Sequence, residues 1–234
     1  MRILVFELKG SLAHFRRPDT TVTHATYPFI PRTVLWGLLG SVLGVEQLTG
    51  ENWIGIQLMS PVHTVAQEVS MLGKGWVGGG GSFNRPTSIE LVVNPRYRVY
   101  YAGEHFNDLK DMIGNSCSHY HTYLGSAYCL TFPRYLETIE AEEITTPYPA
   151  QMSTRTVLPS HSVKQLDPQS GSQYGRVGGM QYQHLGNRTF SGTINLLYEV
   201  HGGLIKFEPV RTPSLDAPPY RFLHISGDEV ICLW

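Results

Sequence analysis

Side chains that can bind phosphate occur together near the start of the sequence. His14, Arg16 and Arg17 follow an apolar segment at residues 2–9, which Gly10 ends. A loop in this position can bring guanidinium groups and ring nitrogens to the phosphates or base edges of a nucleic acid. Adjacent arginines also occur often on solvated surfaces, so the pair indicates phosphate binding without establishing it.

A fourth candidate, Arg32, opens the clearest helical segment. Leu35, Leu38, Leu39 and Val42 repeat after it at the spacing of one helical face. A cation at this place would add to the partial positive charge of the helix N-terminus and favour an anion there. The alternative is a salt bridge from Arg32 to Glu7 or another acid.

A glycine-rich segment at residues 73–86 separates two stretches with strand character. It lacks the terminal Lys-Ser or Lys-Thr of a phosphate-binding loop, and no helix follows it, so nucleotide binding is not expected there. Its side chains suit a hairpin tip that lies along an RNA strand and stacks a ring on a base. These side chains are Lys74, Trp76, Phe83 and Arg85. The alternative is a flexible linker.

Metal and cofactor chemistry is not expected. His119 and His121 lie between Cys117 and Cys129, but there is no Cys-x-x-Cys pair, and zinc needs about four suitably spaced ligands. The sequence also lacks the Gly-x-Ser-x-Gly, His-Glu-x-x-His and dinucleotide-binding motifs. We therefore expect no metal, no cofactor and no generic hydrolase activity.

The composition is that of a globular protein, with 41% hydrophobic residues and 16% charged residues among 234. A net charge of −1 gives no global attraction to nucleic acid, so any contact must come from local basic clusters. Arginine outnumbers lysine by 13 to five, which favours bidentate phosphate contacts. Without a signal peptide or membrane span, and with three cysteines expected to be reduced, we expect a cytoplasmic protein with no membrane contact.

The elements that would position these residues follow a βαββαβ order. The expected strands lie at 2–9, 61–72, 87–101 and 127–136, and the expected helices begin at Pro31 and span 104–113. This order is that of a ferredoxin-like or RRM-like domain, here residues 1–137 of an α+β protein, with an inserted β-hairpin thumb at about 70–88.

The remaining residues, 138–234, are rich in proline and are expected to form an irregular, β-rich extension. One hairpin is expected from residues 193–200 and 203–209. In the first helix, Gly37, Gly40 and Gly44 are expected to allow close packing on a sheet.

Four segments resemble the CRISPR-associated Cas5 family. They are LKGSLAHFRRP at 8–18, YPFIPRTVLWGLLG at 27–40, LVVNPRYRVY at 91–100 and HTYLG at 121–125. Together they cover roughly residues 1 to 130. The segment at residues 138–234 has no motif that aligns clearly with the family.

This resemblance implies a subunit of a type I Cascade complex, nearest to type I-B, that anchors the 5′ handle of the crRNA. Its partners would be the crRNA, the backbone subunit and the large subunit, with target DNA reached only through the complex. His14, Arg16, Arg17, Arg32, Lys74, Trp76, Phe83 and Arg85 would be the RNA-binding residues.

Two alternatives to a non-catalytic subunit stay open. One branch of the family cleaves precursor crRNA without metal, using a tyrosine, a lysine and a histidine. Here no histidine adjoins any of the lysines at 9, 74, 110, 164 and 206, although distant residues such as His121 could still assemble such a site. The other alternative is a protein-protein adaptor without RNA contact.

Overall fold

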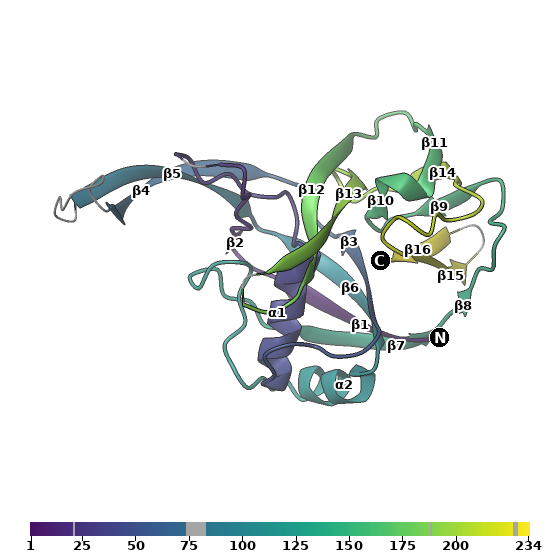
Figure 1. Cartoon of the computed structure of the whole chain (residues 1–234), viewed down its shortest axis with the longest axis horizontal. Helices are drawn as coiled ribbons and strands as arrows, with labels where there is room; N and C mark the ends of the chain where they lie inside the picture. The colour runs from purple at the N-terminus through teal and green to yellow at the C-terminus, as the bar shows by residue number, and fades with distance from the viewer. Residues whose placement is uncertain (21, 74–82, 188, 227–228) are drawn as a thin grey trace.

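The computed structural model describes residues 1–20, 22–73, 83–187, 189–226 and 229–234. This part of the chain is rich in strands and has two α-helices, α1 (Arg32–Leu43) and α2 (Phe106–Gly114), so the predicted α+β class is confirmed. Figure 1 shows a broad body from which one long hairpin projects. No helix in the described ranges has the length and apolar character needed to cross a membrane.

The body is built around a four-stranded antiparallel sheet in the order β3-β6-β1-β7. Its strands are β1 (Arg2–Lys9), β3 (Asn52–Leu58), β6 (Arg96–Gly103) and β7 (Arg134–Glu140). α1 lies between β1 and β3 in the chain and α2 between β6 and β7, and both helices pack on one face of the sheet. Leu4, Phe6 and Leu8 of β1 point to that face, and Ile3 and Val5 point away, as strand alternation requires.

α1 has the buried leucine face that its spacing predicts, but its glycines do not pack on the sheet. Gly37 is exposed with open space around it, and Gly40 approaches the main-chain oxygen of Val45. Gly44 ends the helix at φ 74°, a left-handed conformation that glycine adopts without strain. The expectation that these three glycines allow close helix-sheet packing is therefore wrong.

The strand predicted at 61–72 forms as β4 (Thr64–Gly73), but it belongs to the projecting hairpin, and the second strand of the central sheet is β3, at 52–58. A short apolar run such as Trp53–Leu58 gives no periodicity by which it can be recognised. Another strand prediction is largely wrong. Of the predicted strand at 127–136, only the last residues belong to β7, since β7 begins at Arg134.

The projecting hairpin consists of β4 (Thr64–Gly73) and β5 (Phe83–Val93), with the short β2 (Leu12–Ala13) paired to its base. β4 and β5 extend beyond the predicted thumb at about 70–88, to Thr64 and Val93, and residues 74–82 of the predicted range lie outside the described residues. The predicted strand at 87–101 is divided by Asn94, whose φ of 48° turns the chain from β5 into β6.

The C-terminal half is more regular than predicted. One sheet has the order β10-β13-β12 and another the order β11-β14-β9-β16-β15-β8. The strands are β8 (Glu142–Glu143), β9 (Met152–Thr154), β10 (Leu158–Pro159), β11 (Val163–Asp167), β12 (Tyr174–His184), β13 (Phe190–Glu199), β14 (Ile205–Pro209), β15 (Arg221–Ser226) and β16 (Glu229–Leu233), with a 3-10 turn at Ser160–Ser162.

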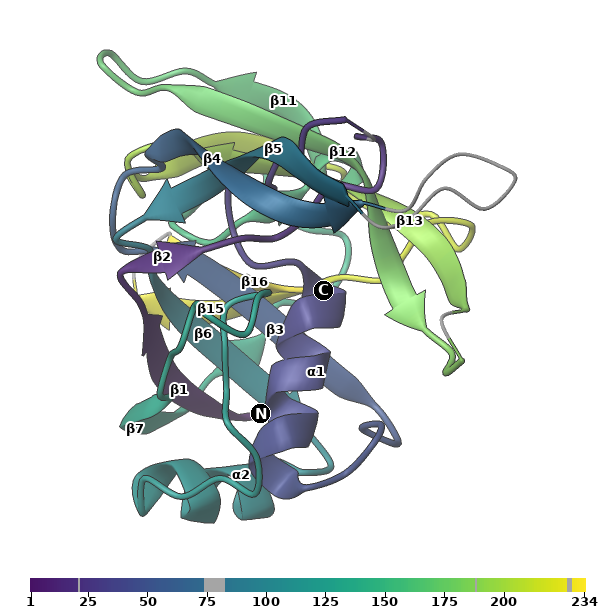
Figure 2. The ribbon, with the colours of Figure 1, turned by 90° about the vertical axis from the view of Figure 1, so that its left-hand side faces the viewer.

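The hairpin expected from residues 193–200 and 203–209 does not form. β13 pairs with β12 and β10, whereas β14 pairs with β9 and β11 in another sheet. The β12–β13 hairpin instead descends beside the N-terminal end of α1 (Figure 2). One continuous hydrophobic core includes residues of both halves of the chain, from Leu4 to Trp234.

Arg32 is buried, with 8% of its surface exposed, and it joins four elements. Its guanidinium donates hydrogen bonds to the main-chain oxygens of Trp234 and, at 3.2 Å, Asn52. The same group lies 4.6 Å from the ring centres of both Trp36 and Tyr182, which sandwich it. The expected salt bridge to Glu7 does not form, because Glu7 is paired with two other arginines.

This burial predicts a large loss of stability when Arg32 is replaced. Arg32→Met removes the guanidinium donor to the Asn52 and Trp234 oxygens, although the Trp234 oxygen still accepts from the Ile54 amide at 3.4 Å. It also removes the cation between the rings, so we expect a loss of about 2–4 kcal/mol in the free energy of unfolding. Urea denaturation followed by tryptophan fluorescence measures it. Arg17→Met, which changes an exposed arginine, is the matched control and should lose much less. Equal losses in both variants would contradict the role given to Arg32.

Candidate functional site

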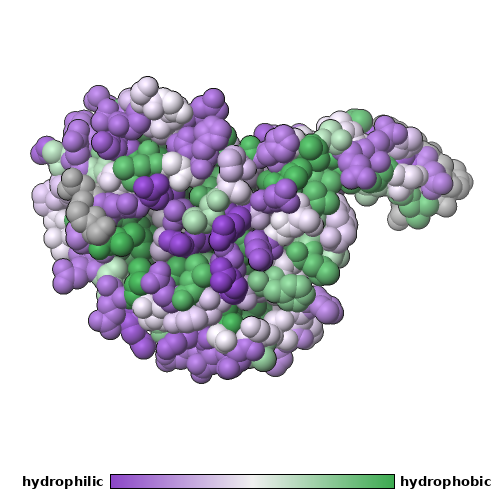
Figure 3. Space-filling model, turned by 180° about the vertical axis from the view of Figure 1, so that it is seen from behind, coloured by the Kyte–Doolittle hydropathy of each residue, from purple (hydrophilic) through white to green (hydrophobic). Residues whose placement is uncertain are grey.

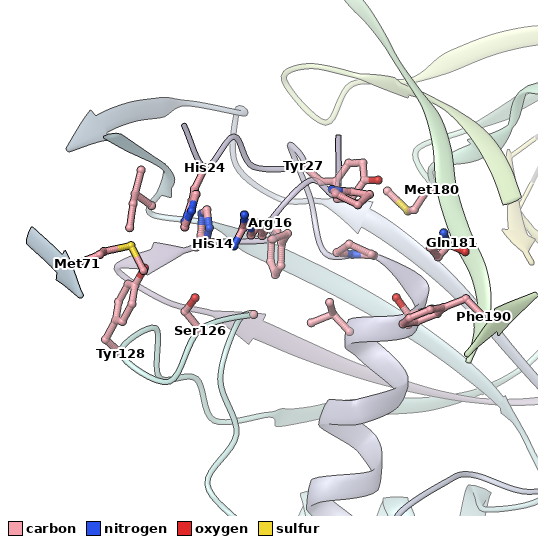
Figure 4. A pocket seen from close by; sticks show the side chains of 17 residues that line it. His14, Arg16, His24, Tyr27, Met71, Ser126, Tyr128, Met180, Gln181 and Phe190 are labelled. Carbon is pink, nitrogen blue, oxygen red and sulfur yellow. The ribbon is translucent and has the colours of Figure 1, made fainter. Parts of the chain in front are cut away.

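A groove of about 710 Å³ lies where the thumb, the N-terminal end of α1 and the β12–β13 hairpin meet (Figure 4). Five separate segments contribute its walls. The lining residues are His14, Phe15, Arg16, Pro18, His24, Tyr27, Pro31, Thr33, Val34, Met71, Ile89, Gly125, Ser126, Tyr128, Met180, Gln181 and Phe190. No single stretch of sequence therefore contains the site.

The loop that carries His14 and Arg16 is held in place by hydrogen bonds within residues 14–27 and by hydrogen bonds to β5 of the thumb. Arg16 and Thr26 form a β-bridge, and the Tyr27 amide donates to the Phe15 oxygen at 2.8 Å. His24 pairs with β5, where its amide donates to Ser88 and its oxygen accepts from Glu90. The position of the loop is thus coupled to the base of the thumb.

A second loop closes the groove from the side of α2. The amide of His14 donates to the Leu124 oxygen at 3.1 Å, which places Gly125 directly against the His14 main chain. A Cβ at Gly125 would lie 2.1 Å from the His14 oxygen, and its φ is 86°. Only glycine fits at position 125 without moving the loop. Leu124 and Gly125 thus both serve to hold the His14 main chain in place.

The groove has a positive character. Among its described lining residues, Arg16, His14 and His24 can carry positive charge, and none is a carboxylate. Arg16 is exposed, and its guanidinium donates to the Thr20 oxygen at 3.5 Å. The N-cap residue of α1, Pro31, offers no side-chain acceptor to the first amides of the helix, and its neighbour Thr33 also lines the groove. Such a helix end favours anions.

The two histidines lie as a stacked pair, with ring centres 6.3 Å apart. Nδ1 of His14 donates to the Glu90 oxygen at 2.8 Å, and its Nε2 has no partner among the described residues. Burial lowers the pKa of His24, and the nearby positive charges of Arg16, His14 and Arg85 lower it further. The pKa of His24 thus lies below the ordinary value of a histidine.

The other predicted site residues have different placements. Arg17 is exposed but paired with Asp19 at 2.6 Å, outside the groove. Arg85 is exposed on β5, opposite Met71 in the thumb. Phe83 begins β5, but its side chain lies outside the described residues, as do Lys74 and Trp76. Arg32 does not line the groove, since its buried guanidinium lies between Trp36 and Tyr182.

Several groove residues have no recognisable signal in the sequence. Tyr128, Met180 and Phe190 come from segments far from His14 in the chain, and only the fold brings them together. His24 and Tyr27 lie in the segment between β2 and α1, and the pairing of His24 with β5 brings them close to His14.

His119 and His121 are exposed on the loop beside α1, where the His119 amide donates to the Val42 oxygen. Neither residue lines the groove. The described residues contain no cluster of three or more His, Cys, Asp or Glu side chains that could hold a metal. All three cysteines are free, with Cys117 exposed and the other two buried.

Comparisons with known proteins agree with this fold. Residues 3–72 match a family described as CRISPR-associated protein (Cas_Cas5), and this match includes β1, the groove loop and α1. No curated protein matches the sequence.

Three solved structures have a similar fold over most of their length. A CRISPR protein from Archaeoglobus fulgidus is 10% identical, with 99% of each chain covered and a TM-score of 0.55. A chain of a CRISPR RNA-guided surveillance complex is 12% identical, with 92% of this chain and 95% of that one covered and a TM-score of 0.54. A Cas protein is 13% identical, with 86% and 95% covered and a TM-score of 0.50.

The family match covers the β1, groove-loop and α1 region, and the fold agrees with that of solved CRISPR proteins along almost the whole chain. Residues 3–72 of the chain are thus similar to the CRISPR-associated Cas5 family, and its fold is similar to that of solved CRISPR proteins.

Proposed function

We propose that the chain is a non-catalytic RNA-binding subunit of a type I CRISPR surveillance complex, and that its groove holds the 5′ handle of the crRNA. The observation that carries this proposal is the groove itself, in which Arg16, two imidazoles and an α-helix N-terminus face one space without a carboxylate among the described lining residues. A single-stranded handle exposes both phosphates and bases to such a site.

The shape of the groove suits a strand that runs between two hairpins. Met71 and Ile89 of the thumb form one wall, and Met180 and Phe190 of the β12–β13 hairpin form the other. Tyr128 is 61% exposed beside the first wall, where its ring can stack on a base. Arg16 then binds phosphate while the hairpins confine the strand.

The order β1-α1-β3-β6-α2-β7, with its antiparallel sheet, supports a ferredoxin-like or RRM-like domain at residues 1–137. Residues 138–234 then form an extension that shares its core with the domain. Both parts contribute to the groove, so we propose that RNA binding needs the whole chain.

The proposed neighbours are the backbone and large subunits of the complex. An exposed, uncharged surface follows α2, and such a surface is typical of the centre of a protein interface. It includes the side chains of Tyr120, Tyr123, Leu130 and Phe132, each at least 43% exposed. We propose that this surface packs on a neighbouring subunit and that target DNA is reached only through the assembly.

The first test compares Arg16→Ala with Arg17→Ala. Only Arg16 lines the groove, so its removal should lower retention of crRNA in the reconstituted complex and reduce the salt-dependence slope by about 0.7. Arg17→Ala, with the same change of charge but an arginine already paired with Asp19, should retain more crRNA. Filter binding across a salt series measures both. Equal retention in the two variants would contradict the groove assignment.

The second test uses the pKa of His24, measured by NMR titration. In the free protein, burial and neighbouring cations hold it below 6.5. Phosphates in the groove would offset those cations, so the pKa of His24 should rise in the RNA complex. Because protonated His24 then favours the complex, RNA affinity should increase as the pH falls toward the pKa of His24. A peptide nucleic acid of the same sequence, which has no phosphates, is the control. A pKa that RNA leaves unchanged would count against phosphate binding beside His24.

The third test concerns catalysis, since the paired imidazoles of His14 and His24 are the observation that favours a ribonuclease. The described groove residues include no lysine to stabilise the charge of a phosphorane, and Nδ1 of His14 is bound to a main-chain oxygen. We expect no cleavage when repeat RNA is incubated with the purified chain in EDTA. Specific cleavage that is lost in His14→Ala or His121→Ala would overturn the non-catalytic assignment.

A further inference from the structure

The face of the central sheet turned away from α1 and α2 has a covered half and an open half. β15 and β16 cover the first half, where Leu223, Ile231 and Leu233 pack on Ile3 and Val5. The open half lies toward the other end of β1, and it carries charged side chains in place of apolar ones. Figure 3 shows this side of the molecule, with strongly hydrophilic residues near the middle.

Two arginines on the open half are held in fixed positions by one buried carboxylate. Glu7 is 3% exposed and accepts hydrogen bonds from Nε of Arg96 and from Nε and Nη2 of Arg134, the last at 2.9 Å. Burial raises the pKa of Glu7, but the two guanidinium groups outweigh it and lower the pKa overall. Glu7 is thus ionised and neutralises one of the two positive charges.

The free edges of both guanidinium groups are available to a ligand. The side chains of Arg96 and Arg134 are 49% and 60% exposed. Glu7 binds Arg96 through Nε alone, and neither terminal nitrogen of Arg96 has a described protein partner. An arginine oriented in this way can bind an anion with less loss of side-chain entropy than a mobile one.

Two further cations adjoin this pair. Across β1 and β6, Lys9 lies opposite Arg96, and Glu7 lies opposite Arg98. Nε of Arg98 is buried without a described partner, and Arg98 lines a polar hollow of about 460 Å³ beside the cluster. Arg96 and Arg98 are two residues apart on β6, so they lie on the same face of the sheet with their Cα atoms about 7 Å apart.

The charge balance of this surface is positive. Lys9, Arg96, Arg98 and Arg134 face two nearby carboxylates, Glu7 and Glu137, while Arg155 and Glu229 at the rim pair with each other at 3.3 Å. A local excess of cations on a chain of net charge −1 marks a surface for a polyanion.

We propose that this open half of the sheet, defined by Lys9, Arg96, Arg98 and Arg134, is a second nucleic-acid site that binds backbone phosphates without reading bases. Cations repeated along a strand suit the regular spacing of phosphates. Tyr100, the ring that lines the hollow beside Arg98, is buried and so cannot stack on a base. An acidic protein would also need apolar anchors at the centre of its interface, and the four defining side chains are all cationic. The groove lies on another side, so this proposal is independent of the handle assignment.

The test is fluorescence anisotropy of the full-length chain with unrelated sequences of single-stranded RNA, single-stranded DNA and duplex DNA. Lys9→Gln/Arg98→Gln removes two contacts and leaves the Glu7 pairs intact. It should reduce the salt-dependence slope by about 1.4 for single strands and about 1.8 for a duplex. The strand type for which the variant loses most affinity at one fixed salt concentration is the one that this surface prefers. A triple variant, Glu7→Gln/Arg96→Gln/Arg134→Gln, removes the anchored pair without leaving Glu7 unpaired and should show a similar loss.

Lys164→Gln/Lys206→Gln is the control, since it makes the same change of charge on β11 and β14 and should bind as the unsubstituted chain does. The proposal is overturned if the control loses as much as Lys9→Gln/Arg98→Gln, or if neither loses affinity. It is also overturned if polyglutamate displaces the nucleic acid at an equal charge concentration, because the surface would then suit an acidic protein. Arg16→Ala should leave the contribution of the open half unchanged, so the two proposals can fail separately.

Discussion

The buried guanidinium of Arg32 is the interaction on which the shape of the site depends. It links the start of α1 to β3 through Asn52, to the end of β16 through Trp234, and to β12 through Tyr182. A buried cation is tolerated only where acceptors and rings surround it, so these elements can meet in few other ways. The wall formed by the β12–β13 hairpin therefore keeps a fixed position beside the helix end that lines the groove.

The C-terminal half determines which surfaces of the central sheet are available. β15 and β16 bury Ile3, Val5 and Trp53, and this removes half of the face opposite the helices from solvent. The groove beside α1 and the open half of the sheet both carry exposed positive groups. A net charge of −1 conceals this distribution, because acidic residues elsewhere balance it.

Local patterns were enough to predict some of these features. The apolar segment at residues 2–9, the leucine spacing of α1 and the strand character around the glycine-rich segment all gave correct elements. The position of His14 and Arg16 after β1 also placed them in a loop that lines the groove.

Pairing between distant segments could not be predicted. β3 has too short an apolar run to be recognised, and β13 and β14 join different sheets because of contacts with strands far away in the chain. Neither prediction for Arg32, an anion-binding cation at the helix N-terminus or a salt bridge to an acid, includes its acceptors, because main-chain oxygens up to 202 residues distant leave no mark in the sequence. Tyr128 and Phe190 reach the groove for the same reason, through the fold alone.

Photo-crosslinking tests the central claim most directly. A crRNA with 4-thiouridine at single handle positions is assembled into the complete complex, irradiated, and the crosslinked peptides are identified by mass spectrometry. If the groove holds the handle, crosslinks will form to the segment from His14 to Tyr27 and to the loop that contains Tyr128. Handle crosslinks that fall only on other subunits, in a complex that contains this chain, would contradict it.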